Sequence, residues 1–529
     1  MRASTSSSES PGSNLTGATT PSSNDPSADG QLLTKRLRLL ERKDELDGLD
    51  EIRTAPIFTE SARQRAVDVA ASSDSLFSQY GVIAGNVSEN GLRNDGIFYY
   101  NVAAPSSTFI CGSQGSGKSH TLCCLLENCL IPSDVNELPR PLTGIVFHYD
   151  TFISDSGGSP CEAAFLSTHP DVSVRVLCAP TNVAVIRKTY SRFPKVKIEE
   201  LRINQTDLNT KRMMDLMAVK EGGNMPLYLH VVSRILRELR LEQQSTNSTF
   251  KYAAFSSRIR DEPLTVAQRN PLIQRLDTLE SFMVKEQVEA PMPSPQGKKK
   301  KHKGPANKNT GNDWTPKSGQ LTIVDLSCPC VTAETACSLF NICLSLFIEQ
   351  EPSVGRIVAL DEAHKYMNES AEAGTLTEQL LATIRLQRHL GARIVISTQE
   401  PTVSPKLLDL CSMTIVHRFT SPDWLYALQR HLAGISIISR LREKTDGRDD
   451  EAGRLSDNFK ELSIKDTDAA TAMFAHIVQL KVGEALIFAP SAVLGIDDSL
   501  SVKRLSHGVL KVRIRNRVTE DGGRSVMAG

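Results

Sequence analysis

A glycine-rich stretch that ends in lysine and serine constrains the fold of this chain more than any other feature of its sequence. Residues 112–119 read GSQGSGKS, which fits the pattern of Gly, four residues, Gly-Lys and then Ser or Thr. An apolar run, 107–111, leads into the stretch, and an amphipathic segment of helical length, 117–130, follows it. This order of strand, glycine-rich turn and helix is the context in which the pattern forms a phosphate-binding loop.

The residue types in the loop suit an anion. Glycines let the backbone wrap closely around phosphate groups and point successive N–H groups inward, and the helix that starts here directs its positive end at the same place. Lys118 is expected to reach the β- and γ-phosphates of a nucleotide, and Ser119 to place its hydroxyl on Mg²⁺. The predicted cofactor-binding residues are Gly112, Ser113, Gln114, Gly115, Ser116, Gly117, Lys118, Ser119 and His120.

Short β-branched runs alternate with helix-length segments along much of the chain. The expected buried strands are 107–111, 144–150, 172–178, 320–326, 355–361, 392–398 and 413–419, and the expected helices include 117–130, 332–349, 375–389 and 422–432. Such alternation favours an α/β fold in which helices cover both faces of a mostly parallel sheet. With the phosphate-binding loop, it predicts a P-loop NTPase fold.

The composition of the chain changes along its length and predicts seven segments. A Ser- and Pro-rich beginning cannot offset the entropy of ordering, and a later Pro-, Gly- and Lys-rich stretch has no periodicity. The Lys-rich cluster at 298–303 has three readings, a nuclear import signal, a phosphate-seeking patch or a solvated charge run. The segments are a disordered tail (1–30), a region of unclear fold (31–104), the first part of the core (105–204), a helical insertion (205–286), a flexible basic linker (287–319), the second part of the core (320–495) and a C-terminal strand with a tail (496–529).

The net charge and the apolar runs of the chain exclude several classes of protein. Lys and Arg together number 61, as do Asp and Glu, so the formal net charge is zero and any nucleic-acid contact must be local. We expect no membrane span, because no apolar run approaches the ~20 residues that one needs. We also expect no secretory signal, because the first residues lack an apolar stretch. The scattered cysteines fit reduced thiols, which predicts an intracellular location, in the nucleus or the cytoplasm.

Two acidic residues supply the expected second half of the site. The run RIVAL, 356–360, leads to Asp361 and Glu362, which places both carboxylates at the carboxyl end of a buried strand. Ligands bind at this edge of parallel sheets. Asp361 is expected to share the Mg²⁺ shell with Ser119, and Glu362 to accept a proton from the attacking water. The alternative is a solvated acidic turn.

Three further residues complete the candidate catalytic set of Glu362, Lys118, Gln399, Arg388 and Arg385. Gln399 ends the strand 392–398, where its amide could orient the water or sense the γ-phosphate; the alternative is a polar strand end. Arg385 and Arg388 are three residues apart, so they share one helix face. Either is a candidate arginine finger for a neighbouring subunit. A surface helix with salt bridges is the alternative.

These motifs occur in an order that resembles one family. GSQGSGKS, LDEAH, RLQRHLGARIVISTQEP, CSMTIVHRFTSPD and GEALIFAP resemble the HerA–FtsK family of P-loop motor ATPases, and more closely its HerA side. The resemblance covers about 105–180 and 320–495. It implies a RecA-type core with an extra strand between the two nucleotide motifs, ATP and Mg²⁺ as cofactors, and a homo-oligomeric ring, usually a hexamer. In the family such rings move double-stranded DNA or another polymer.

The resemblance also implies residue roles. Lys118 and Ser119 take the roles of the phosphate loop, Asp361 that of the metal ligand, Glu362 that of the catalytic base and Gln399 that of the sensor. Arg385 and Arg388 lie where the family has arginines that act on the neighbouring subunit.

Two other functions remain open. In the first, the chain is a nucleotide-dependent switch or scaffold, with slow turnover, whose insertion (205–286) presents a surface to a protein partner. In the second, it is a small-molecule or nucleotide kinase. Glu362 argues against the kinase, which needs no catalytic glutamate after the metal-binding aspartate.

Overall fold

The computed structural model describes residues 51–69, 76–86, 96–151, 154, 157–217, 227–288, 310–431, 469–497 and 501–522, together with Leu33, Arg36 and Leu37. Contacts divide the chain into two units, residues 1–50 and 51–529, and the account below concerns the second. The tail predicted at 1–30 and the Lys-rich cluster at 298–303 lie outside the described residues. Among the described residues, no helix combines the length and the apolar character that a membrane span requires.

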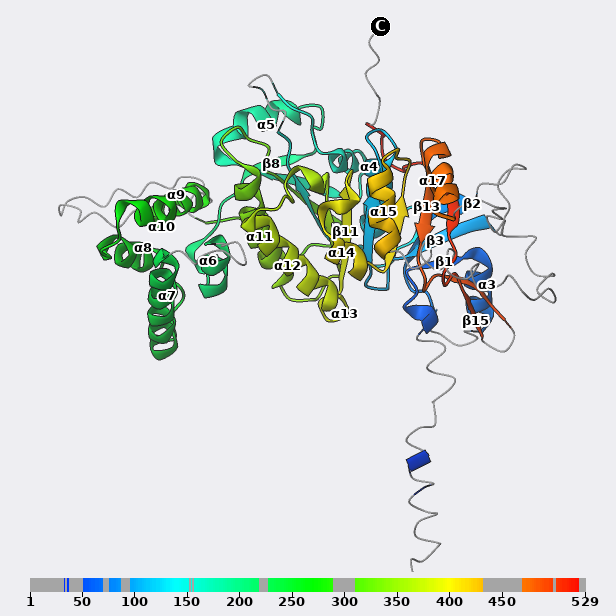
Figure 1. The fold of residues 1–529 in the computed structure, drawn as a ribbon, viewed down its shortest axis with the longest axis horizontal. Helices are drawn as coiled ribbons and strands as arrows, with labels where there is room; N and C mark the ends of the chain where they lie inside the picture. Colours follow the sequence, from blue (N-terminus) through cyan, green and yellow to red (C-terminus); the bar gives the residue numbers. More distant parts are fainter. Residues whose placement is uncertain are drawn as a thin grey trace, which may run out of the picture. The chain divides into compact units, whose positions relative to one another are not determined.

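Eight parallel strands form the core of a sixteen-stranded sheet, as the alternating sequence pattern predicted (Figure 1). The phosphate-binding loop follows β4, and Asp361 follows β10. Strand β11 lies between β4 and β10 and pairs with both. This is the extra strand that the family resemblance implied. The parallel strands, in spatial order, are β8 (Lys197–Glu200), β7 (Ser173–Cys178), β9 (Gln320–Asp325), β6 (Thr143–His148), β10 (Arg356–Leu360), β11 (Ala392–Thr398), β4 (Ser107–Cys111) and β12 (Met413–Val416).

Both faces of the parallel sheet are buried, which explains why its strands are continuous apolar runs in the sequence. Every residue of β4, β10, β11 and β12 is buried. Because side chains alternate along a strand, β10 sends Val358 and Leu360 into one apolar core and Ile357 and Ala359 into the other. Two helical layers cover these cores.

Helices flank the sheet where the sequence predicted them. The helix after the phosphate-binding loop belongs to one core, and three others lie side by side over the opposite core (Figure 1). The first is α4 (Lys118–Leu130); the three are α11 (Ala333–Ile348), α12 (Ala371–Arg385) and α14 (Pro405–Leu410). Short α13 (Gln387–Leu390) follows α12, and α15 (Pro422–His431), α17 (Ala469–Gln479) and α5 (Val183–Thr189) complete the set.

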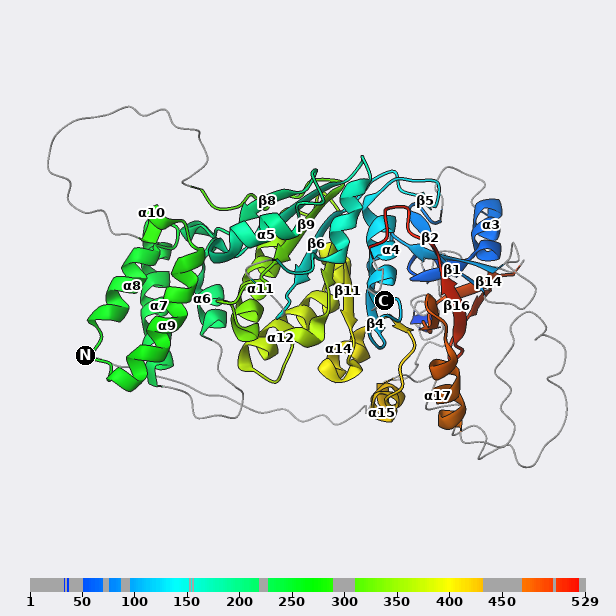
Figure 2. The same ribbon diagram turned by 90° about the horizontal axis from the view of Figure 1, so that it is seen from above.

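The described part of the segment between β8 and β9, for which the sequence predicted a helical insertion at 205–286, contains the helices α6 to α10. Its helices gather away from β2 and β16, next to α11 and α12 (Figure 2). The side chains of Leu272, Leu276 and Leu279 are buried against the rest of this group and continue the core of the helical face of the sheet. The helices are α6 (Thr210–Leu216), α7 (Leu227–Thr246), α8 (Tyr252–Asp261), α9 (Val266–Phe282) and α10 (Lys285–Val288).

Beyond β12 the sheet becomes mostly antiparallel and joins the two ends of this unit. The strands of 51–104, which lie in the region 31–104 whose fold the sequence did not indicate, pair with strands from the C-terminal part of the chain. For example, Ile514 of the late strand β16 is opposite Ala84 of the early strand β2. The strands, in spatial order, are β13 (Glu484–Phe488), β16 (Leu510–Ile514), β2 (Tyr80–Asn86), β3 (Ile97–Asn101), β1 (Ile57–Thr59), β14 (Val493–Ile496) and β15 (Val502–Arg504), with β5 (Asn136–Glu137) beside β2 and helix α3 (Glu60–Val69) after β1.

Candidate active site

The glycine-rich stretch forms a tight loop between β4 and α4. The backbone φ angles of Gly112, Gly115 and Gly117 are 152°, 71° and 109°, and residues other than glycine rarely adopt such angles. A Cβ on Gly112 would lie 2.7 Å from Cβ of His417. The loop therefore requires glycine both for its backbone angles and for its contact with the strand behind it.

Hydrogen bonds inside the loop hold Lys118 in place. Its Nζ donates to the carbonyl oxygen of Ser113 at 3.1 Å, and the side chain is only 3% exposed. Burial lowers the pKa of Lys118, while the nearby carboxylates Glu362 and Asp361 act in the opposite direction. Within the described part of the chain, no carboxylate forms an ion pair with this ammonium group. Lys118 is therefore a buried cation that an anionic ligand would stabilise.

His417, which sequence reasoning missed, supports the loop from behind. Its Nδ1 lies 3.1 Å from the carbonyl oxygen of Glu484, and its Nε2 lies 2.9 Å from Oγ1 of Thr121 in α4. Because a carbonyl oxygen only accepts, Nδ1 carries the proton and Nε2 accepts from Thr121. Burial lowers the pKa of His417 to about 3. The only sequence signal was a histidine directly after an apolar strand.

Asp361 is buried directly after β10, as its position at a strand end predicted. Its Oδ2 accepts a hydrogen bond from Nδ1 of His148 at 3.0 Å, whereas its Oδ1 is buried without a partner among the described residues. Burial raises the pKa of Asp361, but the hydrogen bond and charge of His148, together with Cys161 and Lys365, outweigh this effect, so the pKa lies below its ordinary value. An ionised carboxylate with one unsatisfied oxygen suits a divalent cation or its bound water.

Glu362 and Gln399 meet at the adjacent strand ends. Nε2 of Gln399 donates to Oε2 of Glu362 at 3.3 Å, and Nδ1 of His364 lies 3.3 Å from the same oxygen. The backbone of Glu362 has a φ of 47°, a sparsely populated conformation that is often found at functional sites. Burial lowers the pKa of His364. The structure thus brings together two residues that the sequence assigned to one site.

The two candidate arginines project from the surface. Arg385 ends α12 and Arg388 lies in α13, and both side chains are exposed. Neither makes a hydrogen bond or an ion pair with the residues that the structure describes, so the salt-bridge alternative has no support here. The arrangement leaves both guanidinium groups accessible to another molecule.

Some of the remaining loop residues are exposed to solvent, and others are held in place by neighbouring segments. Gln114 and Gly115 are exposed at the crest of the loop, and Ser119 is partly buried in the first turn of α4. The ring of His120 is held by the C-terminal segment, with Nε2 2.8 Å from the carbonyl oxygen of Arg515 and Nδ1 2.9 Å from Asp521. Any role of His120 toward a nucleotide would pass through its backbone.

The same C-terminal segment is bonded to α4 through the side chain of Glu127, which is 1% exposed. It pairs with Nη1 of Arg515 at 2.8 Å and lies 3.5 Å from Nε of Arg517. It also accepts hydrogen bonds from the backbone N–H groups of Val518 and Thr519 and from the Thr519 hydroxyl. Burial raises the pKa of Glu127, but these partners outweigh it and lower the pKa.

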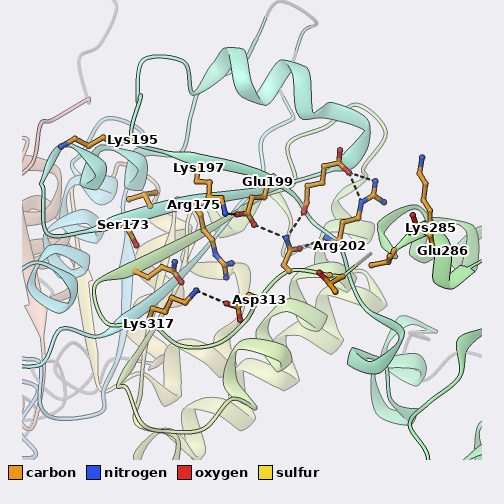
Figure 3. Close-up of a pocket in the computed structure, with 17 residues that line it drawn as sticks. Ser173, Arg175, Lys195, Lys197, Glu199, Arg202, Lys285, Glu286, Asp313 and Lys317 are labelled. Atoms are coloured by element: carbon orange, nitrogen blue, oxygen red, sulfur yellow. Dashed lines mark hydrogen bonds and ion pairs between the residues drawn. The ribbon is translucent and has the colours of Figure 1, made fainter. Parts of the chain in front are cut away.

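A separate hollow lies at the β7, β8 and β9 end of the sheet (Figure 3). It has a volume of about 960 Å³ and shares no residue with the phosphate-binding loop. Most of its charged side chains pair with one another, as Lys197 does with Glu199 and Arg202 with Glu200. Lys317 and Asp313 form a third pair across its wall.

The strand order, the glycine loop and the acidic end of β10 together define a P-loop NTPase fold. No family model matches the chain, and no curated protein matches it. Among solved structures, VirB4 of Thermoanaerobacter pseudethanolicus is 12% identical over 83% of this chain and 97% of its own, with a TM-score of 0.45. The plasmid coupling protein TrwB, in complex with ADP and Mg²⁺, is 10% identical over 85% and 98%, with a TM-score of 0.43.

A third solved structure covers less of the chain. The genome packaging NTPase B204 from Sulfolobus turreted icosahedral virus 2, in complex with AMP, is 16% identical over 35% of this chain and 67% of its own, with a TM-score of 0.20. At these low scores, the fold assignment depends on the strand order and loop geometry of the chain itself.

Proposed function

We propose that this chain binds ATP with Mg²⁺ and hydrolyses it. The observation that carries the proposal is Lys118, a buried cation with no carboxylate ion-pair partner among the described residues, located where Glu362 and Asp361 act on its pKa. The unsatisfied Oδ1 of Asp361 fits a magnesium shell that Ser119 would complete. Bound magnesium would supply positive charge to the phosphate oxygens.

The protein groups around this position have distinct roles. Lys118 and the N–H groups of the loop bind the phosphates and hold them against the start of α4. Glu362, at the adjacent strand end, accepts the proton of the attacking water. Gln399 fixes the orientation of Glu362 through its 3.3 Å hydrogen bond and is positioned to respond to the γ-phosphate. Each role uses a group that the structure places at the carboxyl edge of the sheet.

We further propose that the chain works as a homo-oligomeric ring, a hexamer by its family resemblance, and acts on double-stranded DNA or another polymer. The side chains of Arg385 and Arg388, exposed and without an ion pair to any described residue, support this proposal, because a ring enzyme needs an arginine that reaches the neighbouring nucleotide. An intracellular location, nuclear or cytoplasmic, is supported by the free thiols of all eleven cysteines.

A nucleotide-dependent scaffold remains the second candidate. The observation in its favour is the insertion α6–α10, whose long helix α7 presents exposed side chains such as Leu241, at 66% exposure. In this alternative, nucleotide binding would present the insertion to a protein partner and turnover would be slow.

The first test is steady-state ATP hydrolysis by the purified chain, with and without double-stranded DNA. We expect Glu362→Gln to abolish turnover and Glu378→Gln, a change in an exposed carboxylate on α12, to leave it unchanged. A several-fold rise with DNA supports the motor. Turnover that survives Glu362→Gln contradicts the proposed base, and slow turnover that is indifferent to DNA, in a chain that stays monomeric with ATP, favours the scaffold.

A further inference from the structure

Three potential metal ligands meet beneath the phosphate-binding loop. His148 ends β6, Cys161 precedes the 3-10 helix η2 (Glu162–Thr168), and Asp361 follows β10. One nitrogen, one sulfur and one carboxylate oxygen from these residues lie within 4.8 Å of one another. The residues are 6%, 1% and 3% exposed, respectively. Three sequence segments more than ten residues apart therefore converge on a single buried point.

The cluster contains polar atoms that its own hydrogen bonds do not satisfy. Nδ1 of His148 and Sγ of Cys161 both approach Oδ2 of Asp361, at 3.0 Å and 3.7 Å. This leaves Nε2 of His148 and Oδ1 of Asp361 buried without partners among the described residues. Buried polar atoms of this kind are rare in folded proteins. The three atoms that approach one another, Nδ1 of His148, Sγ of Cys161 and Oδ2 of Asp361, are those that a bound ion would contact.

We propose that His148, Cys161 and Asp361 form a binding site for a transition-metal ion of the zinc type. Imidazole nitrogen, thiolate sulfur and carboxylate oxygen are the ligands that zinc selects, whereas magnesium takes oxygen ligands alone. Ligands about 2.1 Å from a tetrahedral zinc are about 3.4 Å apart, close to the 3.0 Å and 3.7 Å contacts of Oδ2 of Asp361 with Nδ1 of His148 and Sγ of Cys161. Water would complete the tetrahedron.

Loading the site changes the protonation of the cysteine. A Cys161 thiolate would bind the metal, and the thiol proton would leave to solvent.

If the chain hydrolyses ATP as proposed above, metal binding at this site would affect hydrolysis. Oδ2 of Asp361 would bind zinc while Oδ1 of the same carboxylate faces the proposed magnesium shell. Because zinc would withdraw negative charge from Asp361, it would weaken the hold of this residue on magnesium. Zinc would then act as an inhibitor of hydrolysis, in a manner that depends on Cys161.

The direct test uses the purified full-length chain without nucleotide, titrated with Co²⁺ and then displaced by Zn²⁺. We expect one Co²⁺ per chain with a thiolate-to-metal charge-transfer band that Zn²⁺ removes. Cys161→Ser should abolish the band and weaken metal binding by ~100-fold or more, since even outer-shell changes cost 10–100-fold. Cys343→Ser, a change in a buried cysteine of α11 outside the cluster, is the matched control.

Folding of the variants is checked separately. His148→Gln should retain the thermal unfolding profile of a folded chain yet lose the stabilisation that zinc gives to the native protein. A band or a zinc-dependent stabilisation that persists in Cys161→Ser, or the lack of both in the native chain, overturns the proposal. Because these measurements need no ATP, they can fail while the proposed hydrolysis stands, and the reverse also holds.

Discussion

The phosphate-binding region and the hollow at β7 and β8 differ in how their charged groups are satisfied. The hollow is large, about 960 Å³, yet Lys197, Arg202 and Lys317 each have a carboxylate partner in its wall. Around the loop, Lys118 has none in the described chain, and Oδ1 of Asp361 has no partner. The unsatisfied buried groups, rather than the volume of the hollow, are therefore the basis for proposing the loop as the site of chemistry.

The largest expected effect concerns the exposed arginines at the end of α12 and in α13. Arg388→Ala should bind ATP normally but lose about 10³-fold or more in turnover, because an arginine finger contributes that much. Steady-state hydrolysis and nucleotide-binding titrations measure the two parts of this prediction. Arg187→Ala, an exposed arginine on α5, is the control.

Mixing two inactive variants tests whether this arginine acts between subunits. Equal amounts of Arg388→Ala and Glu362→Gln should recover part of the activity, because some interfaces would then combine an intact Glu362 with an intact Arg388. If the mixture stays inactive while oligomers form, or if Arg388→Ala alone turns over normally, the assignment of Arg388 is wrong.

The next effect concerns the support of the loop helix. Glu127→Ala should lower the free energy of unfolding by about 3–5 kcal/mol, because it removes the carboxylate beside the buried charges of Arg515 and Arg517 and leaves Arg517 with Glu162 at 3.5 Å. Denaturant unfolding measures this change. Glu378→Ala removes an exposed pair with Lys406 and should cost less than about 1 kcal/mol. Equal losses in the two variants would contradict the difference between the buried and exposed pairs.

A smaller effect should appear as a pH dependence. The folded-state pKa of His417 is about 3, below its ordinary value of 6.5, so between these pH values the unfolded chain binds a proton that the folded chain does not. Stability from this group is complete above pH 6.5 and is lost as the pH falls toward 3. From pH 6.5 to 5 the loss should be about 2 kcal/mol.

The His417→Gln variant isolates this contribution, because glutamine does not titrate. Its free energy of unfolding should fall less than that of the native chain over the same pH interval, by about 2 kcal/mol. Parallel slopes for the two proteins would show that His417 is not the group responsible.

The smallest effect is expected in the hollow. Lys317→Ala should change stability by less than about 1 kcal/mol and leave ATP turnover unaltered, since its pair with Asp313 is half exposed. Hydrolysis assays and thermal unfolding measure both quantities. A marked loss of turnover would show that the hollow takes part in the chemistry and would contradict the distinction drawn between it and the phosphate-binding region.

The parallel core was predictable because its information is local. Strands such as 356–360 and 392–398 are continuous apolar runs, and the residues that follow them, Asp361 and Gln399, take their places from the strand ends. The loop was predictable for the same reason, since the spacing of its glycines and Lys118 is fixed within eight residues. Where sequence neighbours decide the geometry, the pattern was sufficient.

The antiparallel part and the supports of the site were not predictable in this way. Ile514 pairs with Ala84 across more than 400 residues, and short strands such as 57–59 carry too little pattern to reveal a partner. His148, His417 and Glu127 gain their roles only from the groups that packing brings to them. No local spacing distinguishes them from ordinary core or helix residues.

The ion pair and hydrogen bonds between Glu127 of α4 and the C-terminal segment affect when the site forms during synthesis of the chain. Glu127 and Thr519 are 392 residues apart, so 392 further residues must be synthesised after Glu127 before its carboxylate can meet Thr519. Until then the helix that carries Lys118 contains a buried acidic group with no counter-charge. The proposed ATP site would therefore mature only after Thr519 has been synthesised, and a chain that ends before this residue would be unable to hydrolyse ATP.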